Sequence, residues 1–332
     1  MNQRYRPITR LGMGGTGLGD MYHATTEESA QAAVDASWDA GIRYFDTAPH
    51  YGAGLSEHRF GQALRRRPRD TYTLSTKVGR LLAPHPAGDI ESPFVGTLPF
   101  KRVFDYTADG VRRSIEDSLQ RLALGHIDIV YVHDLSPDYF GNEFDRNFAV
   151  AAGPGGAFEG LVKLREEGVI KGWGLGVNTV EPCLRALRQS DPDIFLLAGR
   201  YTLMETTPLD ELFPLCAQRG ASVVLGGPFN SGFLAGGDHY DYAPATPDKI
   251  AQRERLRQVA ARHGIDLAAA ALQFGLAHPV VAATIPGASS PEHAKRNAAL
   301  MDVAIPAQFW QELRAEGLVP EAAPLPDGKP VL

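Results

Sequence analysis

The stretch Gly41-Ile42-Arg43-Tyr44-Phe45-Asp46-Thr47-Ala48-Pro49-His50-Tyr51-Gly52 decides how this chain is organised. Gly41 can end a helix, because glycine takes the left-handed conformation that a helix C-cap requires. The aromatic and β-branched residues that follow are enough for one buried strand. Asp46 stands where this strand ends and Tyr51 follows in the next turn, so two proton-handling groups can reach one site. Taken alone, a strand that ends in a polar turn is the simpler interpretation, and the rest of the chain has to decide.

Length and composition predict an ordinary globular protein. The chain has 332 residues, of which 44% are hydrophobic and 22% charged. α/β barrels of this length form one domain, so a single domain over residues 1–332 is expected. The net charge of -6 gives no reason to expect nucleic acid or an anionic membrane as a partner.

The sequence shows no sign of a metal framework, a targeting segment or a membrane span. Cys183 and Cys216 form no metal-binding or redox spacing. Residues 1–15 contain no apolar signal core, and no stretch is long enough to span a bilayer. We therefore expect a cytoplasmic protein, as a monomer or a small homo-oligomer, that acts on a small molecule.

Short apolar segments alternate with amphipathic ones along the chain. Thr25-x-x-Glu28 has the pattern of a capping box at a helix start, and Gly125 is expected to stop the helix over residues 111–122. This alternation predicts a parallel sheet with right-handed crossovers. Eight units predict a closed (β/α)₈ TIM barrel with long loops at its C-terminal face. The expected strands cover residues 8–13, 42–46, 71–76, 127–132, 169–177, 193–198, 221–225 and 280–285.

The barrel brings scattered polar residues into one predicted site. Chemistry in such barrels lies at the C-terminal ends of the strands. Asp46, Lys77 and His133 end the second, third and fourth strands, and Tyr51 lies in the loop after the second. Neighbouring strands are about 4.8 Å apart, so these side chains can meet. A capping Asp, a surface Lys and a satisfied core His are the structural alternatives for each one alone.

These four residue types suit proton transfer next to a carbonyl or alcohol. An ammonium beside Tyr51 is expected to lower the pKa of its phenol, because the cation favours phenolate. The Asp46 carboxylate would keep Lys77 charged and in place. His133 can orient a substrate oxygen or share in proton transfer.

Several motifs then point to one family. They are Phe45-Asp46-Thr47-Ala48 with Tyr51-Gly52, Ser75-Thr76-Lys77, Val132-His133, Gly176-Val177-Asn178, Pro228 to Leu234, and Ile285-Pro286-Gly287 with Asn297. Over nearly the whole chain this pattern resembles the aldo-keto reductase superfamily. The resemblance implies that Asp46, Tyr51, Lys77 and His133 form a catalytic tetrad, with Tyr51 and His133 touching the substrate, and it implies no metal.

The resemblance also implies a nicotinamide cofactor. Asn178 would hold the carboxamide, and the segments after the seventh and eighth strands would bind pyrophosphate and adenosine. The cofactor-binding residues implied are Gly15, Thr16, Asp46, Asn178, Pro228, Phe229, Asn230, Ser231, Gly232, Leu234, Ile285, Pro286, Gly287, Ala288, Ser289, His293 and Asn297.

The cofactor preference depends on the segment after the eighth strand. NADPH-using members of the superfamily carry a Lys after its proline and an Arg six residues later. Gly287 and His293 take these places here and carry no fixed positive charge. Lys295 and Arg296 are nearby and could restore phosphate binding. NAD is therefore expected as the preferred cofactor, with NADP possible.

Gly199-Arg200-Tyr201 and Gly226-Gly227-Pro228-Phe229-Asn230 are similar to the branch that contains aldose 1-dehydrogenases and pyridoxal 4-dehydrogenases. This implies oxidation of an aldose such as L-fucose at C1 to the lactone. Oxidation of pyridoxal, or general aldehyde and ketone reduction, is the alternative. Residues 81–106 and 134–156, which follow the third and fourth strands, are expected to wall the pocket with aromatic and polar side chains.

The sequence departs from the superfamily at two places. A glutamine that supports the carboxamide is missing near Ala198, and an aromatic residue that stacks on the nicotinamide is missing near Gly226. Phe229 is the candidate for a stacking face. The usual N-terminal hairpin before the first strand is also missing or trimmed.

Three other interpretations compete. Gly12-x-Gly14-x-x-Gly17 matches the dinucleotide-binding fingerprint of a Rossmann fold. In that fold a helix begins at the last glycine, and no helix is predicted to begin there. These glycines are therefore expected to shape the loop after the first strand. A metal-dependent barrel hydrolase could use His50, His58, His133 and Asp134, without a His-x-His strand end to support it. A cofactor-sensing binding module on the same fold is the third.

Overall fold

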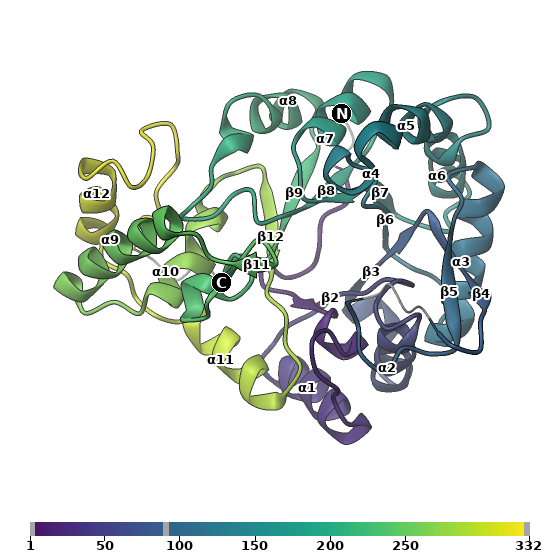
Figure 1. Cartoon of the computed structure of the whole chain (residues 1–332), viewed down its shortest axis with the longest axis horizontal. Coiled ribbons are helices and arrows are strands. Elements are labelled where there is room, and N and C mark those ends of the chain that lie inside the picture. Colours follow the sequence, from purple (N-terminus) through teal and green to yellow (C-terminus); the bar gives the residue numbers. More distant parts are fainter. Residues whose placement is uncertain (1–3, 89–92, 329–332) are drawn as a thin grey trace.

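A parallel sheet of eight strands forms the centre of the protein (Figure 1). The computed structural model describes residues 4–88 and 93–328. Neighbours in the sheet follow their order along the chain, with only the strands of two hairpins left out. The eight strands are β1 (Met13–Gly14), β2 (Tyr44–Asp46), β3 (Thr73–Val78), β6 (Ile129–His133), β7 (Gly172–Val177), β8 (Ile194–Ala198), β9 (Ser222–Gly226) and β12 (Val281–Ile285).

Backbone bridges join the first strand to the last. Leu11 pairs with Thr284 and Gly14 with Gly287, both in the parallel sense, and the Gly14 amide donates to the Pro286 carbonyl at 3.0 Å. The predicted (β/α)₈ barrel is therefore confirmed, as a nearly closed barrel. Its first strand differs from the prediction, because residues 8–10 form bends and the strand begins at Met13.

Glycines allow the close approach at this closure. A Cβ on Gly12 would lie 2.7 Å from Ile285 Cγ2 and 2.9 Å from Tyr44 Cδ1, and one on Gly14 would lie 3.1 Å from the Ile285 carbonyl oxygen. These two glycines thus serve the packing of β1 between its neighbours, rather than the loop after it. Gly17 lies in the loop, at the start of a short 3₁₀ turn, and the Rossmann interpretation does not apply.

Helices surround the sheet and cover its outer face (Figure 1). Their buried side chains join the outer faces of the strands in one large apolar cluster. The helices are α1 (Glu27–Asp39), α2 (Leu55–Leu64), α3 (Ala108–Leu122), α4 (Pro137–Phe140), α5 (Phe144–Ala152), α6 (Ala157–Glu166), α7 (Glu181–Gln189), α8 (Leu212–Arg219), α9 (Pro247–His263), α10 (Leu267–Phe274), α11 (Pro291–Met301) and α12 (Ala307–Ala315).

Two predicted helix ends are wrong by one or two residues. The N-cap of α1 is Thr26, whose hydroxyl accepts a hydrogen bond from the Ser29 amide at 3.2 Å, so the capping pattern is shifted by one residue from Thr25. Helix α3 ends at Ala123, which takes the left-handed conformation with a φ of 52°, before Gly125 is reached. Gly41 follows α1 with a φ of 86°, as predicted.

Two hairpins lie outside the barrel, and the first of them occupies a segment predicted as a loop. β4 (Arg80–Pro84) pairs antiparallel with β5 (Phe100–Phe104), within the predicted loop 81–106. Residues 89–92 of that loop lie outside the described residues. β10 (His239–Tyr240) and β11 (Ala243–Pro244) form the second hairpin, and α4 and α5 occupy the predicted loop 134–156. A hairpin whose strands are separated by a long irregular segment gives no short-range turn signal.

The barrel interior is filled by a separate cluster of side chains, to which Tyr44, Tyr131 and Leu196 belong. The Tyr44 and Tyr131 hydroxyls lie 3.1 Å apart, and the Tyr44 hydroxyl is also 3.1 Å from Ser75 Oγ. These contacts satisfy the buried phenols. The half-buried Tyr5 packs against this cluster from the N-terminal segment.

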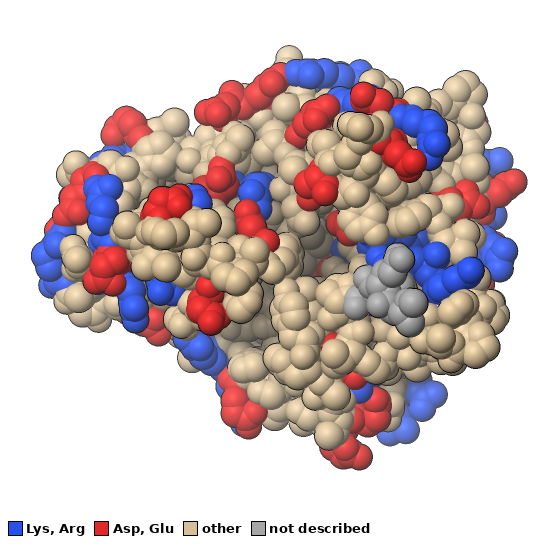
Figure 2. Space-filling model, in the orientation of Figure 1, with Lys and Arg blue, Asp and Glu red and all other residues tan. Residues whose placement is uncertain are grey.

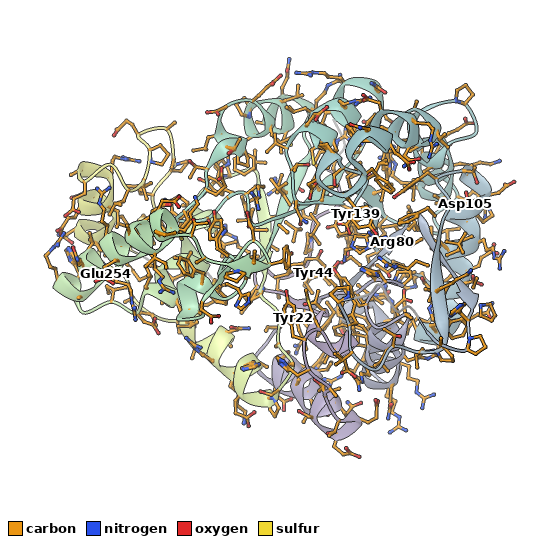
Figure 3. All side chains as sticks on the ribbon, in the orientation of Figure 1. Tyr22, Tyr44, Arg80, Asp105, Tyr139 and Glu254 are labelled. Atoms are coloured by element: carbon orange, nitrogen blue, oxygen red, sulfur yellow. The ribbon has the colours of Figure 1, made fainter. Side chains whose placement is uncertain are left out.

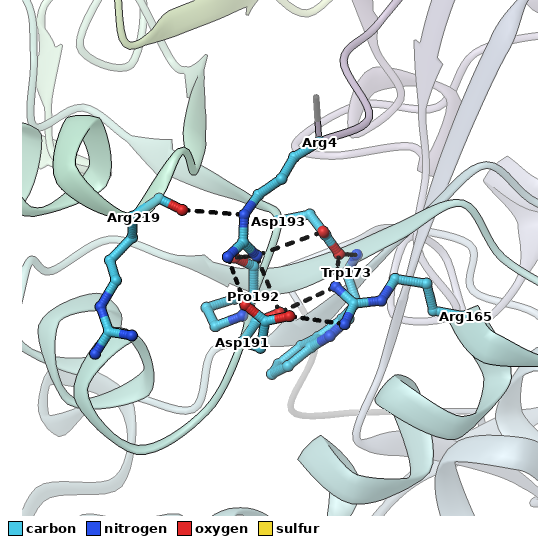
Figure 4. A network of polar contacts seen from close by, with 7 residues as sticks. All are labelled: Arg4, Arg165, Trp173, Asp191, Pro192, Asp193 and Arg219. Carbon is cyan, nitrogen blue, oxygen red and sulfur yellow. Dashed lines mark hydrogen bonds and ion pairs between the residues drawn. The ribbon is translucent and has the colours of Figure 1, made fainter. Parts of the chain in front are cut away.

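A polar network ties the N-terminal segment to the entrances of β7 and β8 (Figure 4). The Arg4 guanidinium donates to the Pro192 carbonyl at 2.7 Å and also forms an ion pair with Asp191. Arg165 donates to Asp193 at 2.6 Å. Residues 4–12 form no hairpin before β1, and this network holds the segment in place.

None of the helices in the described ranges combines the length and the apolar character that are needed to cross a bilayer.

Candidate active site

The barrel brings Asp46, Lys77 and His133 together at the C-terminal ends of adjacent strands. Asp46 is the last residue of β2, Lys77 precedes the last residue of β3, and His133 is the last residue of β6. All three side chains are buried, with exposed fractions of 2%, 1% and 6%. Figure 2 shows a recess near the middle of the face in view.

Lys77 and Asp46 form a buried ion pair. Lys77 Nζ lies 2.7 Å from Asp46 Oδ2 and also donates to the Thr47 carbonyl at 2.9 Å. The Ser75 hydroxyl donates to the other carboxylate oxygen at 2.6 Å. Burial raises the pKa of Asp46, and Lys77 and Ser75 lower it in part. The carboxylate therefore holds the ammonium at one place in the site.

Tyr51 completes the group from the turn after β2. Lys77 Nζ lies 4.6 Å from the centre of its ring, and the His133 ring lies 5.8 Å away in an edge-on arrangement. The Phe94 ring packs against Tyr51 and His50, and its centre lies 5.7 Å from the Tyr51 ring centre and 5.1 Å from the His50 ring centre. The structure thus unites the four residues predicted as a tetrad.

The expected effect of Lys77 on Tyr51 is wrong. Burial raises the pKa of Tyr51 well above its ordinary value, the charges of Asp46 and Asp134 raise it further, and Arg80 lowers it only in part. The physical reason is that Asp46 compensates the Lys77 charge at 2.7 Å. Tyr51 is therefore a neutral phenol at neutral pH.

His133 is held by a residue that the sequence did not indicate. Arg80 Nη1 lies 3.2 Å from His133 Nδ1, and Arg80 Nη2 donates to Asp134 Oδ2 at 2.7 Å. Burial lowers the pKa of His133 well below its ordinary value, and Arg80 and Lys77 lower it further. His133 is therefore neutral. Figure 3 labels Arg80 and Tyr139, whose ring centre lies 4.7 Å from the guanidinium carbon.

Arg80 was missed because it comes after the predicted end of its strand, in a segment read as a loop. Its position in β4 depends on pairing with β5, about twenty residues later. In the sequence, Arg80 is marked only by its position three residues after Lys77. An arginine on the protein surface could stand at the same position. Tyr242, at the turn of the β10–β11 hairpin, was not among the predicted site residues either. Its amide donates to Ser231 Oγ at 2.9 Å and ties the hairpin to the loop after β9.

The predicted cofactor loop after β9 forms a tight turn. Asn230 and Ser231 both have a left-handed backbone, with φ of 47° and 60°. The Asn230 amide nitrogen Nδ2 donates to the Gly199 carbonyl at 3.3 Å, while its buried Oδ1 has no hydrogen-bond partner among the described residues. Pro228 and Leu234 are buried, whereas Phe229, Ser231 and Gly232 are partly exposed.

The second predicted cofactor segment joins β12 to α11. Gly287 is exposed, and Asn297 on α11 donates to its carbonyl at 3.2 Å. His293 is exposed and lies 3.3 Å from Ser289 Oγ through Nδ1. Ile285, Pro286 and Ala288 are buried and Ser289 is partly exposed, whereas Lys295 and Arg296 are exposed on α11.

The other predicted cofactor positions follow β1 and β7. A Cβ on Gly15 would lie 2.6 Å from the Asp46 carbonyl oxygen, so this glycine packs against β2. Thr16 Oγ1 would be 3.6 Å from a Cβ on Gly287. Asn178 directly follows β7 and is partly exposed.

The two positions where the superfamily pattern is broken lie side by side. Ala198 and Gly226 are register partners at the ends of β8 and β9. A Cβ on Gly226 would lie 3.2 Å from Leu196 Cδ2 and 3.3 Å from Ala198 Cβ, so these two strand ends are closely packed.

The aromatic residues predicted to wall the pocket divide into two groups. Phe94 packs on Tyr51, as given above. Phe104, Tyr106, Tyr139 and Phe140 form a cluster of their own beside Arg80, with ring centres 4.9 to 6.3 Å apart. The first group contacts Tyr51 directly, and the second contacts His133 through Arg80 and through Tyr106, whose hydroxyl donates to the His133 carbonyl at 3.3 Å.

The residues considered for a metal-dependent hydrolase do not gather. The rings of His50 and His133 lie 5.8 Å apart, whereas His58 is exposed on α2. Burial lowers the pKa of His50 to about 2, and Arg80 and Arg102 contribute. Residues 4–88 and 93–328 contain no group of three or more His, Cys, Asp or Glu side chains that could hold a metal ion.

Comparison with known proteins places the whole barrel in one family. The aldo/keto reductase family matches residues 10–316. The chain is 41% identical to pyridoxal 4-dehydrogenase of Microbacterium luteolum and 39% identical to D-threo-aldose 1-dehydrogenase of a Pseudomonas species, in each case over 94% of this chain and 95% of the relative. An aldo-keto reductase from Klebsiella pneumoniae, solved in complex with NADPH, superposes with a TM-score of 0.66 at 25% identity, over 96% of this chain and 95% of that one. This chain belongs to the aldo/keto reductase family and is an oxidoreductase of that family.

Proposed function

We propose that this protein is an NAD-preferring dehydrogenase that oxidises an aldose such as L-fucose at C1 to the lactone. The observation that carries the proposal is the buried cluster at the strand ends. It places a neutral phenol, Tyr51, between the Lys77–Asp46 ion pair and the neutral imidazole of His133. This arrangement suits proton exchange with a substrate oxygen.

The reaction removes a hydride from C1 and a proton from the C1 hydroxyl. The C1–H bond breaks with its electron pair, which a bound nicotinamide would accept, and the C1 hydroxyl loses its proton as the C=O bond of the lactone forms. NAD supplies the hydride acceptor when it is bound. The phenolate form of Tyr51 takes the hydroxyl proton and becomes the neutral phenol, and His133 holds the oxygen by a hydrogen bond. The substrate is oxidised by two electrons, which NAD⁺ would accept as the hydride.

The segments after β9 and β12 fit a dinucleotide. Asn230 Oδ1 is a buried acceptor that lacks a partner among the described residues, so a ligand donor can satisfy it. Gly287 to Ser290 precede α11, whose first amides can bind an anionic group such as a pyrophosphate.

The preference for NAD rests on the charges at the same segment. Gly287 and His293 carry no fixed positive charge, and Lys295 and Arg296 are exposed on α11. Recognition of a 2′-phosphate ordinarily uses a charged Arg or Lys contact. The Klebsiella relative was solved in complex with NADPH, so NADP is the alternative cofactor.

Pyridoxal oxidised at its 4′ carbon is the second candidate substrate. The relative of 41% identity is a pyridoxal 4-dehydrogenase, and the Phe94 ring beside Tyr51 offers a flat apolar face for a pyridine ring. The aldose is preferred because the corner around Tyr51 combines that one aromatic face with His50 and His133, which can hydrogen-bond a polyol.

A substrate panel tests the proposal. L-fucose, pyridoxal and a hydrophobic ketone are assayed with both cofactors and in both directions, with NADH or NADPH absorbance as the readout. Turnover of L-fucose with NAD⁺, and a lactone identified by mass spectrometry, is expected. Inactivity with L-fucose and pyridoxal together with strong ketone reduction would reject the substrate class. Cofactor binding without any turnover would favour a cofactor-sensing binding module.

A further inference from the structure

Arg80 is a buried cation in direct contact with His133. Its exposed fraction is 1%, and it donates to the Asp134 carboxylate at 2.7 Å while Nη1 lies 3.2 Å from His133 Nδ1. The ring centres of Tyr139 and Phe104 lie 4.7 and 5.5 Å from its guanidinium carbon. A charge enclosed in this way is costly unless its contacts are specific.

The chemistry of this contact fixes the proton of the imidazole. A guanidinium carries only donors, so His133 Nδ1 must be the acceptor. A neutral imidazole that accepts at Nδ1 carries its proton on Nε2. Nε2 lies 3.6 Å from Asp134 Oδ2, which is too long for a hydrogen bond. His133 Nε2–H therefore donates no hydrogen bond to Asp134.

We propose that Arg80 is a positioning residue that fixes His133 as the Nε2–H tautomer, so that Nε2 can donate to the substrate oxygen. The proposal rests on the proposed function, in which His133 holds that oxygen. Arg80 touches neither the reacting carbon nor the cofactor in this role, and it acts only through His133.

The backbone conformation positions both Arg80 and its partner Asp134. Gly79 has a φ of 96°, and a Cβ there would lie 2.4 Å from the Tyr106 ring, so glycine allows the sharp turn from β3 into β4. Asp134 has a φ of 47°, and its amide donates to the Gly176 carbonyl at 2.9 Å. The turn directly after His133 thereby points the carboxylate at the guanidinium. Arg80 is held in place before any ligand arrives.

Charges from several elements surround His133. They are the cations Arg80, Lys77 and Arg102, the carboxylate Asp134, and the titratable rings His50 and Tyr51. Burial is the first cause of the lowered His133 pKa and Arg80 the second. Arg80 thus selects the tautomer and also opposes formation of the imidazolium.

Nitrogen NMR of the imidazole tests the tautomer without any substrate. Spectra of ¹⁵N-labelled protein that correlate ring nitrogens with ring protons distinguish Nδ1–H from Nε2–H, and His133→Gln identifies the His133 signals. We expect Nε2–H in the wild type and in Arg80→Lys, which keeps a cationic donor. Arg80→Met keeps the apolar length without a donor, so a mixture of tautomers is expected. A proton on Nδ1 in the wild type, or an unchanged Nε2–H tautomer in Arg80→Met, would reject the proposal.

Steady-state kinetics then test the consequence. Partners that fix the tautomer of a metal-bound histidine typically contribute about 10- to 100-fold to activity, so a loss of that size in kcat is expected for Arg80→Met, with a smaller loss for Arg80→Lys. Arg69→Gln is the matched control, because Arg69 pairs with Asp128 at 2.6 Å at the opposite end of the barrel. It should leave kcat unchanged. A kcat for Arg80→Met within threefold of the wild type, despite mixed tautomers, would overturn the positioning role.

The two measurements separate the proposal from the function on which it rests. If L-fucose and pyridoxal are not turned over, the proposed function fails, and the NMR result still decides whether Arg80 fixes the tautomer. If the wild type turns over substrate but carries the proton on Nδ1, only the inference about Arg80 fails. If Arg80→Met does not fold, the wild-type spectrum and Arg80→Lys still decide.

Discussion

The Lys77 ammonium lies 4.6 Å from the centre of the Tyr51 ring and, at the same time, 2.7 Å from the Asp46 carboxylate. The Asp46 carboxylate is therefore the charge nearest to the Lys77 ammonium. The opposite charges of Lys77 and Asp46 largely cancel in their effect on the Tyr51 phenol. This explains why burial, which raises the pKa of Tyr51, outweighs the ammonium beside it. The predictions on pH and on Lys77 follow from this relationship.

The oxidation rate should rise with pH. Tyr51 must be phenolate to take a proton, and its pKa lies well above the ordinary value. Below that pKa, the phenolate fraction rises by up to about tenfold per pH unit. We expect kcat/KM for oxidation to increase from about pH 7 to pH 10 without a plateau, while carbonyl reduction, which uses the phenol, stays flat. A plateau of the oxidation rate near neutral pH would contradict this assignment.

Tyr51→Phe should reduce turnover and leave the cofactor bound. Acid-base groups typically contribute about 10² to 10⁴ in rate, and the phenyl ring keeps the contacts with Lys77 and Phe94. The checks are steady-state kcat and a fluorescence titration with NADH. The pH slope described above should disappear as well. Near wild-type turnover would mean that another group moves the proton.

Lys77→Met should destabilise the protein, and more so at high pH. Breaking a buried ion pair typically costs about 3 to 5 kcal/mol, because the remaining charge stays buried. Without Lys77, the folded-state pKa of Asp46 rises further above its unfolded value. The folded state then binds a proton that the unfolded state has released, so stability is lost as pH rises between the two values. The loss in urea unfolding should be smaller at pH 5 than at pH 8. Asp46→Asn in the same background should remove this pH difference, and equal losses at both pH values would mean that Asp46 is not the group responsible.

Gly287→Lys together with His293→Arg should move the preference towards NADP. A lysine side chain fits at Gly287, because only Thr16 Oγ1 lies within 4 Å of a Cβ built there, at 3.6 Å. A charged hydrogen bond to the 2′-phosphate contributes about 1.5 to 3 kcal/mol, which corresponds to about 10- to 150-fold in relative kcat/KM. The wild type should prefer NAD. If it prefers NADP and Arg296→Gln abolishes that preference, Arg296 reaches the phosphate.

Arg4→Met should weaken the fold without affecting catalysis. Arg4 contacts Asp191, Pro192, Asp193 and the Arg219 carbonyl at the entrance of β8, as drawn in Figure 4. Loss of hydrogen bonds to a charged group costs about 1.5 to 3 kcal/mol, which urea unfolding can measure. The kcat should stay unchanged, since the network lies at the N-terminal ends of the strands. A change in kcat larger than the change in folded fraction would show coupling through β8.

Local patterns were sufficient to predict the barrel and the meeting of Asp46, Lys77 and His133. Asp46, Lys77 and His133 each stand at or next to the end of a short, largely apolar strand, and parallel strands place those residues at one end of the barrel. The boundaries were less well predicted, because Thr25 and Thr26 are equally good caps and Ala123 takes a conformation that sequence assigns to glycine. The barrel-closing role of Gly12 and Gly14 was hidden, because their contacts are with Ile285, far along the chain.

The sequence by itself determined the order of strands and helices, since periodicity and turn residues act over a few positions. It also determined which polar residues stand at strand ends. Only the tertiary structure decided the electrostatics of the site. The pKa of Tyr51 depends on burial and on charges from Asp46, Asp134 and Arg80, and no local pattern records how deeply a residue lies. The contact of Arg80 with His133 was likewise decided by the fold, because it requires the β4–β5 hairpin to place a guanidinium beside a strand fifty residues later.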